Sequence, residues 1–180
     1  LEAYERCGVQ VRDGYDARTA HRSLNLMFAE WANRGLNLWT IEQREVVLTA
    51  NVHEYTLPAD TVDALSAVIR TNANTSNQQD ITIDRIGSAE YLHVPNKYTP
   101  SRPAQYFVQR TVPAKLFLYP APDATQQYIF RYYAIRRIQD TGAFTNTADI
   151  SFRFLPCLIA GLAYYLAIKQ APDRVPMLKQ

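Results

Sequence analysis

The spacing of apolar residues changes twice along this chain, and that change constrains the fold more than any other feature. Over residues 16–34 the apolar side chains recur every three or four positions, which predicts an amphipathic helix. Residues 152–170 again have helical spacing, with apolar side chains on more than one face. Between these segments lie short runs of β-branched and aromatic residues separated by turn residues. Helices at both ends and strands in the middle predict an α+β fold.

The middle of the chain is expected to hold about seven strands. Their connections are short and rich in Pro, Asn or Gly, which favours antiparallel hairpins over βαβ crossovers. A single helical turn at residues 88–92 is expected to interrupt them, with Ser88 as its N-cap. The expected strands are residues 45–49, 54–57, 64–70, 80–84, 105–110, 115–119 and 127–135.

These elements predict a single structural domain made of two modules. The terminal helices, in residues 1–40 and 150–180, are expected to pack together as a helical bundle, with residues 41–149 inserted as an antiparallel β module. A chain of 180 residues buries about 70% of its unfolded surface, so one sizeable core is expected without disulfides or metal ions. The core residues expected to join the terminal helices are Leu24, Phe28, Trp31, Leu158 and Leu162.

Charge and cysteine content exclude several classes of protein. With 19 Lys and Arg against 17 Asp and Glu, the net charge of +2 is too balanced for a dedicated nucleic-acid binder. Cys7 and Cys157 lie far apart and form no C-x-x-C pair, so neither a disulfide scaffold nor a zinc site is indicated. The sequence starts at Leu1 rather than Met and stops at Gln180 directly after a lysine, which is compatible with truncation at both ends.

The longest apolar run bears on membrane association. It covers residues 157–168, about twelve residues, whereas a membrane-spanning helix needs about twenty. We therefore expect a helix buried in the core and no membrane partner.

Residues with catalytic potential are present, but not in the spacing that common sites require. His21, His53 and His93 have no neighbouring ligands of the H-E-x-x-H or C-x-x-C type, so no metal site is predicted. The tripeptide at residues 87–89, Gly-Ser-Ala, lacks the G-x-S-x-G spacing of a nucleophile elbow. No G-x-x-x-x-G-K phosphate loop occurs either. We expect neither a cofactor nor enzymatic activity.

Paired carboxylates leave one enzymatic alternative open. Asp80 with Asp84, or Glu30 with Glu42 or Glu45, could serve as the acid and base of a glycosidase if folding placed them roughly 5 to 10 Å apart. Peptidoglycan cleavage by a hydrolase of the muramidase type is therefore kept as the alternative function. Solvated faces explain the same residues without any catalytic role.

Tyrosine and arginine are unusually frequent. The chain has 12 tyrosines and about four arginines for each lysine. Both residue types are favoured at protein interfaces, because Tyr buries a large area with a polar tip and Arg forms interface ion pairs. The simpler interpretation is that tyrosines line the exposed face of a sheet.

Three segments are expected to contact partners rather than the core. Two are turns of the β module, at residues 72–77 and 120–123, whose Asn, Thr, Ser, Pro and Asp content suits projecting loops. The third follows Ile168, where Pro172 and Pro176 should hold the chain extended. The apolar side chains of this third segment lie between cations, and the segment is too short to bury them by folding on itself.

Five stretches, spread over about residues 4–169, resemble in the same order the head-to-tail adaptor proteins of short-tailed bacteriophages, which are also called tail accessory factors. The stretches are DARTAHRSLNLMFAEWANRGLNLW, YTLPADTVDALSAVIR, AEYLHVPNKYTPSRPAQYFVQR, LFLYPAPD and RFLPCLIAGLAYYLAIK. The ordered series is more specific than any single stretch.

This resemblance implies a structural protein with a helical bundle and an inserted β module. Such an adaptor forms a twelve-fold ring beneath the portal, closes the DNA-filled head and presents a platform for the tail nozzle. Its partners would be the portal protein, the nozzle protein and neighbouring subunits, with DNA passing through the lumen without sequence-specific binding. It would reside in the virion tail beside the portal, after assembly in the host cytoplasm. The competing hypotheses are this structural adaptor, a tail-associated peptidoglycan hydrolase of the muramidase type and a generic phage interaction module.

The resemblance also suggests roles for the three exposed segments. Family members carry more helix before the first stretch and a longer C-terminal segment that docks on the portal, of which only residues 172–180 have a counterpart here. The expected nozzle or neighbour contacts are Asn72, Asn74, Asn77, Pro120, Pro122 and Asp123. The expected portal-docking residues are Lys169, Arg174, Val175, Met177, Leu178 and Lys179.

Overall fold

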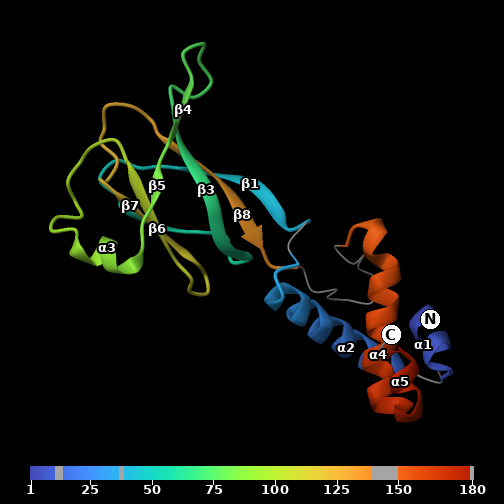
Figure 1. The fold of residues 1–180 in the computed structure, drawn as a ribbon. Helices are drawn as coiled ribbons and strands as arrows, with labels where there is room; N and C mark the ends of the chain where they lie inside the picture. Colours follow the sequence, from blue (N-terminus) through green and yellow to red (C-terminus); the bar gives the residue numbers. More distant parts are fainter. Residues whose placement is uncertain (11–13, 37–38, 139–149, 179–180) are drawn as a thin grey trace. The chain divides into compact units, whose positions relative to one another are not determined.

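The computed structural model describes residues 1–10, 14–36, 39–138 and 150–178 (Figure 1). The chain divides into two compact units. The helical unit comprises Leu1–Trp39 and Ile138–Gln180, and the β unit comprises Thr40–Arg137. Helices and two sheets together confirm the predicted α+β class.

The helical unit is built from two long helices and several short ones. Gly8 and Gly35, which follow α1 and α2, have φ angles of 68° and 76°. This left-handed conformation commonly ends a helix, and glycine adopts it with less strain than any other residue. Pro156 lies in the first turn of α4, where its missing N–H costs no hydrogen bond. The elements are α1 (Glu2–Cys7), α2 (Gly14–Asn33), a 3₁₀ turn (Phe152–Phe154), α4 (Leu155–Gln170), a second 3₁₀ turn (Pro172–Arg174) and α5 (Val175–Leu178).

Helix α4 packs against both α1 and α2 through two apolar clusters. On the α1 side, Cys7 is buried beside Ala163 and its thiol donates a hydrogen bond to the Ala163 carbonyl oxygen at 2.9 Å. On the α2 side, Met27 and Phe28 form the centre of the second cluster. Of the expected core residues, Phe28 is buried, Leu24, Trp31 and Leu158 are partly buried against the α2 cluster, and Leu162 is partly buried against the α1 cluster.

The expectation that α4 is a buried helix is wrong. Only Ala163, Leu166 and Ala167 are buried along it. The reason is that α1 and α2 cover only part of the circumference of α4, although its side chains are apolar on all sides.

The β unit consists of two four-stranded sheets, with strand orders β1-β8-β3-β4 and β2-β7-β6-β5. The expected strand at residues 80–84 is instead two strands, β4 and β5, one in each sheet, separated by the buried Ile83. The bounds are β1 (Ile41–Val47), β2 (Glu54–Thr56), β3 (Thr61–Thr71), β4 (Gln79–Thr82), β5 (Asp84–Arg85), β6 (Gln105–Gln109), β7 (Lys115–Tyr119) and β8 (Ile129–Arg136), with α3 at Ser88–His93.

One strand pair corrects the expectation of a wholly antiparallel module. β5 pairs with β6 in parallel, with Asp84 opposite Gln105. The physical reason is that α3 and the loop after it supply the long crossover connection that parallel neighbours need. The N-cap of α3 is Gly87 rather than Ser88, and the Gly87 N–H donates to the Glu90 carboxylate at 2.8 Å.

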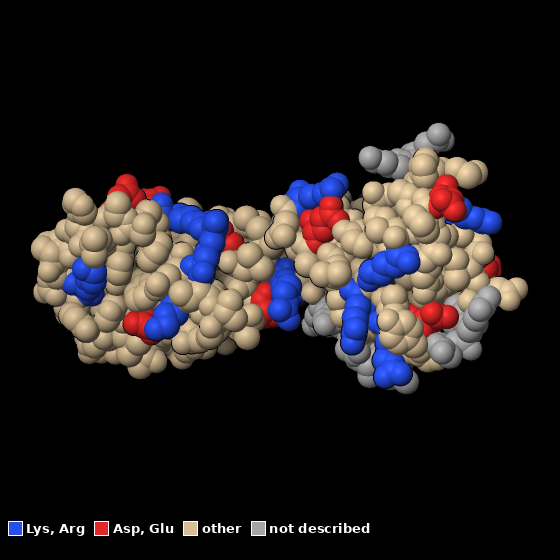
Figure 2. Space-filling model, turned by 90° about the horizontal axis from the view of Figure 1, so that it is seen from below, with Lys and Arg blue, Asp and Glu red and all other residues tan. Residues whose placement is uncertain are grey.

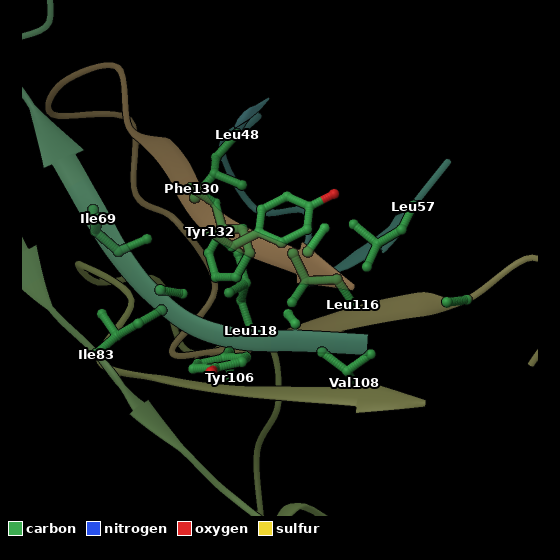
Figure 3. Packing of buried hydrophobic residues seen from close by; sticks show 14 of the residues in the cluster. Leu48, Leu57, Ile69, Ile83, Tyr106, Val108, Leu116, Leu118, Phe130 and Tyr132 are labelled. Atoms are coloured by element: carbon green, nitrogen blue, oxygen red, sulfur yellow. The ribbon is translucent and has the colours of Figure 1, made fainter. Parts of the chain in front are cut away.

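The core of the β unit lies between the two sheets (Figure 3). Along β8 the burial alternates, so that Phe130, Tyr132 and Ala134 face the core while Tyr133 is exposed. The Phe130 ring lies edge-on to Tyr106 of the other sheet, with 5.5 Å between ring centroids. Leu116 and Leu118 of β7 are fully buried in the same cluster.

A buried carboxylate also joins the two sheets. Asp63 on β3 accepts hydrogen bonds from Arg85 on β5 at 2.7 Å and from Arg110, just after β6, at 2.6 Å. Arg85 also donates to the Ala64 carbonyl oxygen at 2.8 Å. The ion pairs compensate for the burial of the Asp63 carboxylate and link the two sheets.

Candidate interaction surfaces

The loop between β3 and β4 projects three of the expected contact residues into solvent. Asn72, Asn74 and Asn77 are all exposed. Asn72 and Asn74 adopt φ angles of 49° and 61°, a left-handed conformation that Asn tolerates better than most residues. The Thr75 hydroxyl donates to the Asn72 carbonyl oxygen at 2.7 Å, and the Asn72 amide donates to the Asn77 carbonyl oxygen at 3.4 Å. The loop therefore presents polar side chains from an internally bonded turn.

The turn after β7 does not project as expected. Pro122 is fully buried, and its carbonyl oxygen accepts a hydrogen bond from the Asn51 N–H at 2.7 Å. A proline ring has no N–H to satisfy, so its burial costs little. Asp123 accepts hydrogen bonds from the Thr125 side chain and from the Tyr128 hydroxyl, the latter at 3.1 Å. The Thr125 bond is the main cause of the lowered pKa of Asp123. Pro120 is partly buried.

The C-terminal segment is folded rather than extended, which corrects a second expectation. Val175 and Leu178 are three positions apart on one helical turn, and both pack on the α1–α4 cluster. Arg174 lies so close to Gly8 that a Cβ atom there would come within 2.0 Å of its guanidinium. Met177 is 77% exposed. Lys169 donates to the Ser23 hydroxyl at 2.9 Å, and Lys179 lies outside the described residues.

Four of the five carboxylates of the glycosidase alternative, Asp80, Glu30, Glu42 and Glu45, are engaged in ion pairs. Both Asp80 oxygens accept hydrogen bonds from Arg70 at 2.7 Å, and these bonds are the main cause of the lowered pKa of Asp80. Glu30 accepts a hydrogen bond from the Tyr165 hydroxyl, which lowers its pKa. A glycosidase acid needs a raised pKa. Glu30 belongs to the helical unit and Glu42 and Glu45 to the β unit, while Asp84 is exposed on β5 of the second sheet.

The histidines are dispersed over the structure. His21 lies on α2, His93 ends α3, and the His53 ring packs edge-on to Tyr98 with 4.6 Å between centroids. Among the residues that the structure describes, no three His, Cys, Asp or Glu side chains come together as a metal site would require.

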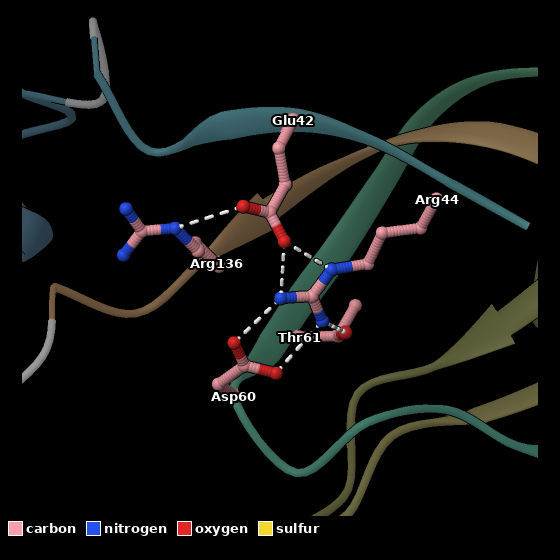
Figure 4. A network of polar contacts seen from close by, with 5 residues as sticks. All are labelled: Glu42, Arg44, Asp60, Thr61 and Arg136. Atoms are coloured by element: carbon pink, nitrogen blue, oxygen red, sulfur yellow. Dashed lines mark hydrogen bonds and ion pairs between the residues drawn. The ribbon is translucent and has the colours of Figure 1, made fainter.

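A polar network holds the end of the first sheet (Figure 4). The Arg44 guanidinium donates to both oxygens of Asp60, at 2.7 and 2.6 Å, and to the Thr61 hydroxyl at 2.8 Å. Glu42 accepts hydrogen bonds from Arg44 and, at 3.2 Å, from Arg136. The network joins β1, β8 and the start of β3, next to the two points where the chain passes between the units. Hydrogen bonding to Asp60 raises the pKa of Arg44 and lowers that of Asp60.

Replacing Arg44 by methionine is expected to destabilise the β unit by about 2 kcal/mol at pH 7, because Asp60 and Glu42 lose their shared cation. The lowered folded pKa of Asp60 means that its contribution is present above the unfolded pKa, about 3.9, and is lost as the pH falls through the folded value. The difference between wild type and variant should therefore shrink below about pH 4. Urea denaturation of both proteins at pH 7 and pH 3 measures this difference in the free energy of unfolding.

The matched control is Lys115→Met, which removes an exposed pair with Glu54. We expect a change within about 1 kcal/mol at either pH. A constant difference between Arg44→Met and wild type from pH 7 to pH 3 would show that the Asp60 pair does not carry the effect.

Many of the arginines form ion pairs with carboxylates of the same chain. Figure 2 shows basic and acidic side chains interspersed on the face drawn, rather than one large area of a single sign. The tyrosines do not share one environment. Tyr106 and Tyr132 are core residues, whereas Tyr98 and Tyr133 are exposed, as expected for an interface or for the outer face of a sheet. Arginines in ion pairs within the chain are Arg6, Arg34, Arg44, Arg70, Arg85, Arg110, Arg131 and Arg136.

Helix α4 exposes apolar side chains that the sequence led us to place in the core. Cys157 and Ala160 are exposed, and Ile168 is half exposed. Together with the turn before it, α4 covers Phe152–Gln170, which is long and apolar enough to cross a membrane by length and composition. Of its most apolar stretch of 18 residues, 17% is buried. The expectation that the segment is too short to span therefore fails on length alone, because the helix is longer than its uninterrupted apolar run.

Sequence reasoning missed the Arg44 network and the exposed face of α4. A signal for the network existed, since Glu42 and Arg44 alternate on one strand and so lie on one face. No local signal could have identified the exposed face of α4, because its side chains resemble those of a buried helix.

Comparison with known families gives a match along nearly the whole chain. The family model described as SU10 adaptor protein matches residues 6–179, which include parts of both units. No curated protein matches the sequence.

Proposed function

The chain belongs to the SU10 adaptor protein family, and on that premise we propose that it is a structural head-to-tail adaptor of a short-tailed bacteriophage. Twelve copies form a ring beneath the portal, help to retain the packaged DNA and provide the platform for the tail nozzle. The protein resides in the virion tail beside the portal and is assembled in the host cytoplasm. The family match over residues 6–179 is the observation that carries this proposal.

The chemistry of the described residues supports a structural role over the hydrolase alternative. Asp80 and Glu30 are hydrogen-bonded by Arg70 and Tyr165, and their pKa values are lowered, opposite to the direction that a general acid needs. The near balance of charge suits a lumen through which DNA slides without sequence-specific binding.

Within the proposed subunit, the terminal helices act as one bundle that forms the body of the ring, and the β unit is inserted between them in the sequence. The loop with Asn72, Asn74 and Asn77 contacts the nozzle or a neighbouring subunit. Its exposed, internally bonded turn supports this assignment, since binding loops are commonly held on a rigid scaffold. Pro122 is left out because it is buried.

The decisive experiment mixes the purified protein with its portal and measures mass by native mass spectrometry. We expect a monomeric or weakly associated protein alone and twelve copies on each portal. Peptidoglycan turbidity should not change. Failure to bind the portal, or clearing of peptidoglycan at catalytic concentrations, would contradict the proposal.

The C-terminal segment is proposed to dock on the portal through its exposed side chains. Because Val175 and Leu178 pack inside the helical unit, the large apolar side chain that remains exposed for a partner in this described segment is Met177. Replacing Met177 by aspartate should weaken portal binding at least about tenfold, equivalent to about 1.4 kcal/mol, without changing the melting temperature. Surface plasmon resonance and differential scanning fluorimetry give the two readouts.

The control is Leu178→Ala, which should lower the stability of the helical unit by about 1 to 2 kcal/mol, because its side chain packs against α1 and α4. Unchanged portal affinity of Met177→Asp would place the docking surface elsewhere on the helical unit.

A further inference from the structure

Helix α4 carries an apolar stripe on the side that neither α1 nor α2 covers. The stripe consists of Cys157, Ala160, Tyr164 and Ile168, whose spacing of three and four positions places them on one face. We call these four residues the α4 stripe. Other faces of the helix are occupied, by Ala163 against α1 and by Gly161 against Met27. No charged residue occurs between Leu155 and Ile168.

Among the residues that the structure describes, Cys157 and Ala160 are exposed, Ile168 is half exposed and Tyr164 is partly buried. An exposed apolar stripe of this kind favours a partner surface, because a helix that is apolar on all sides is normally buried. A lipid bilayer does not suit it. Tyr165 and Lys169 on the same helix are hydrogen-bonded to Glu30 and Ser23 of α2. Spanning a bilayer would either break these bonds or carry Glu30 and its ion pair with Arg34 into hydrocarbon. The α4 stripe therefore fits a protein partner.

The outer face of α2 offers a complementary surface. Arg18, Arg22, Leu26 and Ala29 are all exposed and share one helical face. We call these four residues the α2 stripe. Leu26 is 59% exposed and supplies the large apolar side chain of this stripe. The arginine stems can lie over apolar side chains, and a guanidinium is attracted to the face of a tyrosine ring such as that of Tyr164. The α4 stripe holds no cation that would repel them.

We propose that the α4 stripe of one copy packs against the α2 stripe of the next copy around the ring. This inference rests on the proposed ring function. Two different surfaces meet in such a contact, so it can repeat from copy to copy and close a ring, whereas a contact of α4 with α4 would stop at a dimer. Each stripe has one small residue next to a large one, Ala160 beside Tyr164 and Ala29 beside Leu26, which leaves room for a large side chain of the other stripe.

The test uses three matched alanine-to-glutamate variants at exposed helical positions. Ala160→Glu charges the α4 stripe, Ala29→Glu charges the α2 stripe, and Ala89→Glu on α3 is the control in the β unit. Each is mixed with portal at fewer than twelve copies per portal, and the number bound is read by native mass spectrometry. Circular dichroism confirms that the variants fold.

Wild type and Ala89→Glu should give empty and complete portals with few partial rings, because lateral contacts make binding cooperative. Ala160→Glu and Ala29→Glu should give a random distribution of partial rings and require at least tenfold more protein to fill the portal. Each variant keeps one intact stripe, so their mixture should bind mainly as pairs.

Cys157 provides a second readout in the unmodified protein. It is exposed, whereas Cys7 is buried, so alkylation of the lone chain should modify Cys157 first. In the ring, its alkylation rate should fall at least tenfold, as followed by peptide mass spectrometry.

The outcomes separate the two levels of inference. Cooperative rings formed equally by Ala160→Glu, with Cys157 still reactive, would overturn the α4 contact and leave the adaptor function standing. A defect in Ala160→Glu alone would overturn the α2 half of the contact and place the partner of the α4 stripe on another surface of the neighbouring copy. Protection of Cys157 by phosphatidylcholine vesicles, but not by the ring, would favour a lipid surface instead. Wild-type protein that binds no portal would overturn both inferences.

Discussion

Replacing Phe130 by alanine is expected to lower the free energy of unfolding of the β unit by about 3 to 5 kcal/mol. Phe130 is fully buried at the centre of the core between the sheets. Its ring contacts Tyr106 of the opposite sheet and lies 5.2 Å from the ring of Tyr132. Truncation would leave a cavity that the paired strands cannot close without breaking hydrogen bonds in β8.

The measurement must report on the β unit alone. Both tryptophans, Trp31 and Trp39, belong to the helical unit, so tryptophan fluorescence does not follow the sheets directly. Amide hydrogen exchange of β8 peptides, read by mass spectrometry, gives the required local free energy. Tyr133→Ala on the same strand is the control, because that side chain is 48% exposed. Equal losses in the two variants would contradict the assigned core face of β8.

Replacing Gly161 by leucine is expected to destabilise the helical unit by about 3 kcal/mol, because the helices cannot separate without losing their apolar contacts. A Cβ atom at Gly161 would lie 2.6 Å from the sulfur of Met27 on α2. Met27 is itself fully buried, so its side chain has little room to move aside. Gly161 is thus the point of close approach between α2 and α4.

The adjacent residue provides the control for this variant. Ala160→Leu adds similar bulk on the exposed side of α4 and should change stability by less than about 0.5 kcal/mol. Urea denaturation followed by tryptophan fluorescence reports on the helical unit, which holds Trp31 and Trp39. If Gly161→Leu unfolds at the same urea concentration as Ala160→Leu, α2 and α4 do not pack as described.

Local patterns predicted most of the secondary structure. The long helix that becomes α2 was expected at residues 16–34 and spans Gly14–Asn33, because a run of apolar residues at helical spacing is a short-range property. The helical turn α3 and the strands β6, β7 and β8 lie at or close to the expected positions for the same reason. Strand β3 is longer than expected, at Thr61–Thr71, with irregular pairing near Asp63.

The candidate surfaces were less predictable, because exposure depends on what packs nearby. Asn72 and its neighbours were expected to be exposed, since a run of polar turn residues rarely enters a core. Pro122 belongs to a similar-looking turn but is buried, and its carbonyl oxygen is hydrogen-bonded to the distant Asn51. Val175 and Leu178 pack on α1, which lies more than 160 residues earlier in the chain.

The sequence by itself determined the α+β class, the positions of the main helices and strands, and the resemblance to a family that the match over residues 6–179 supports. These properties depend on residue spacing within a few turns of chain. Only the tertiary structure decided the parallel pairing of β5 with β6, the burial of Pro122 and the uncovered face of α4. Each depends on which distant elements pack together, and apolar contact is not directional, so one apolar residue serves equally in a core or at an interface between subunits.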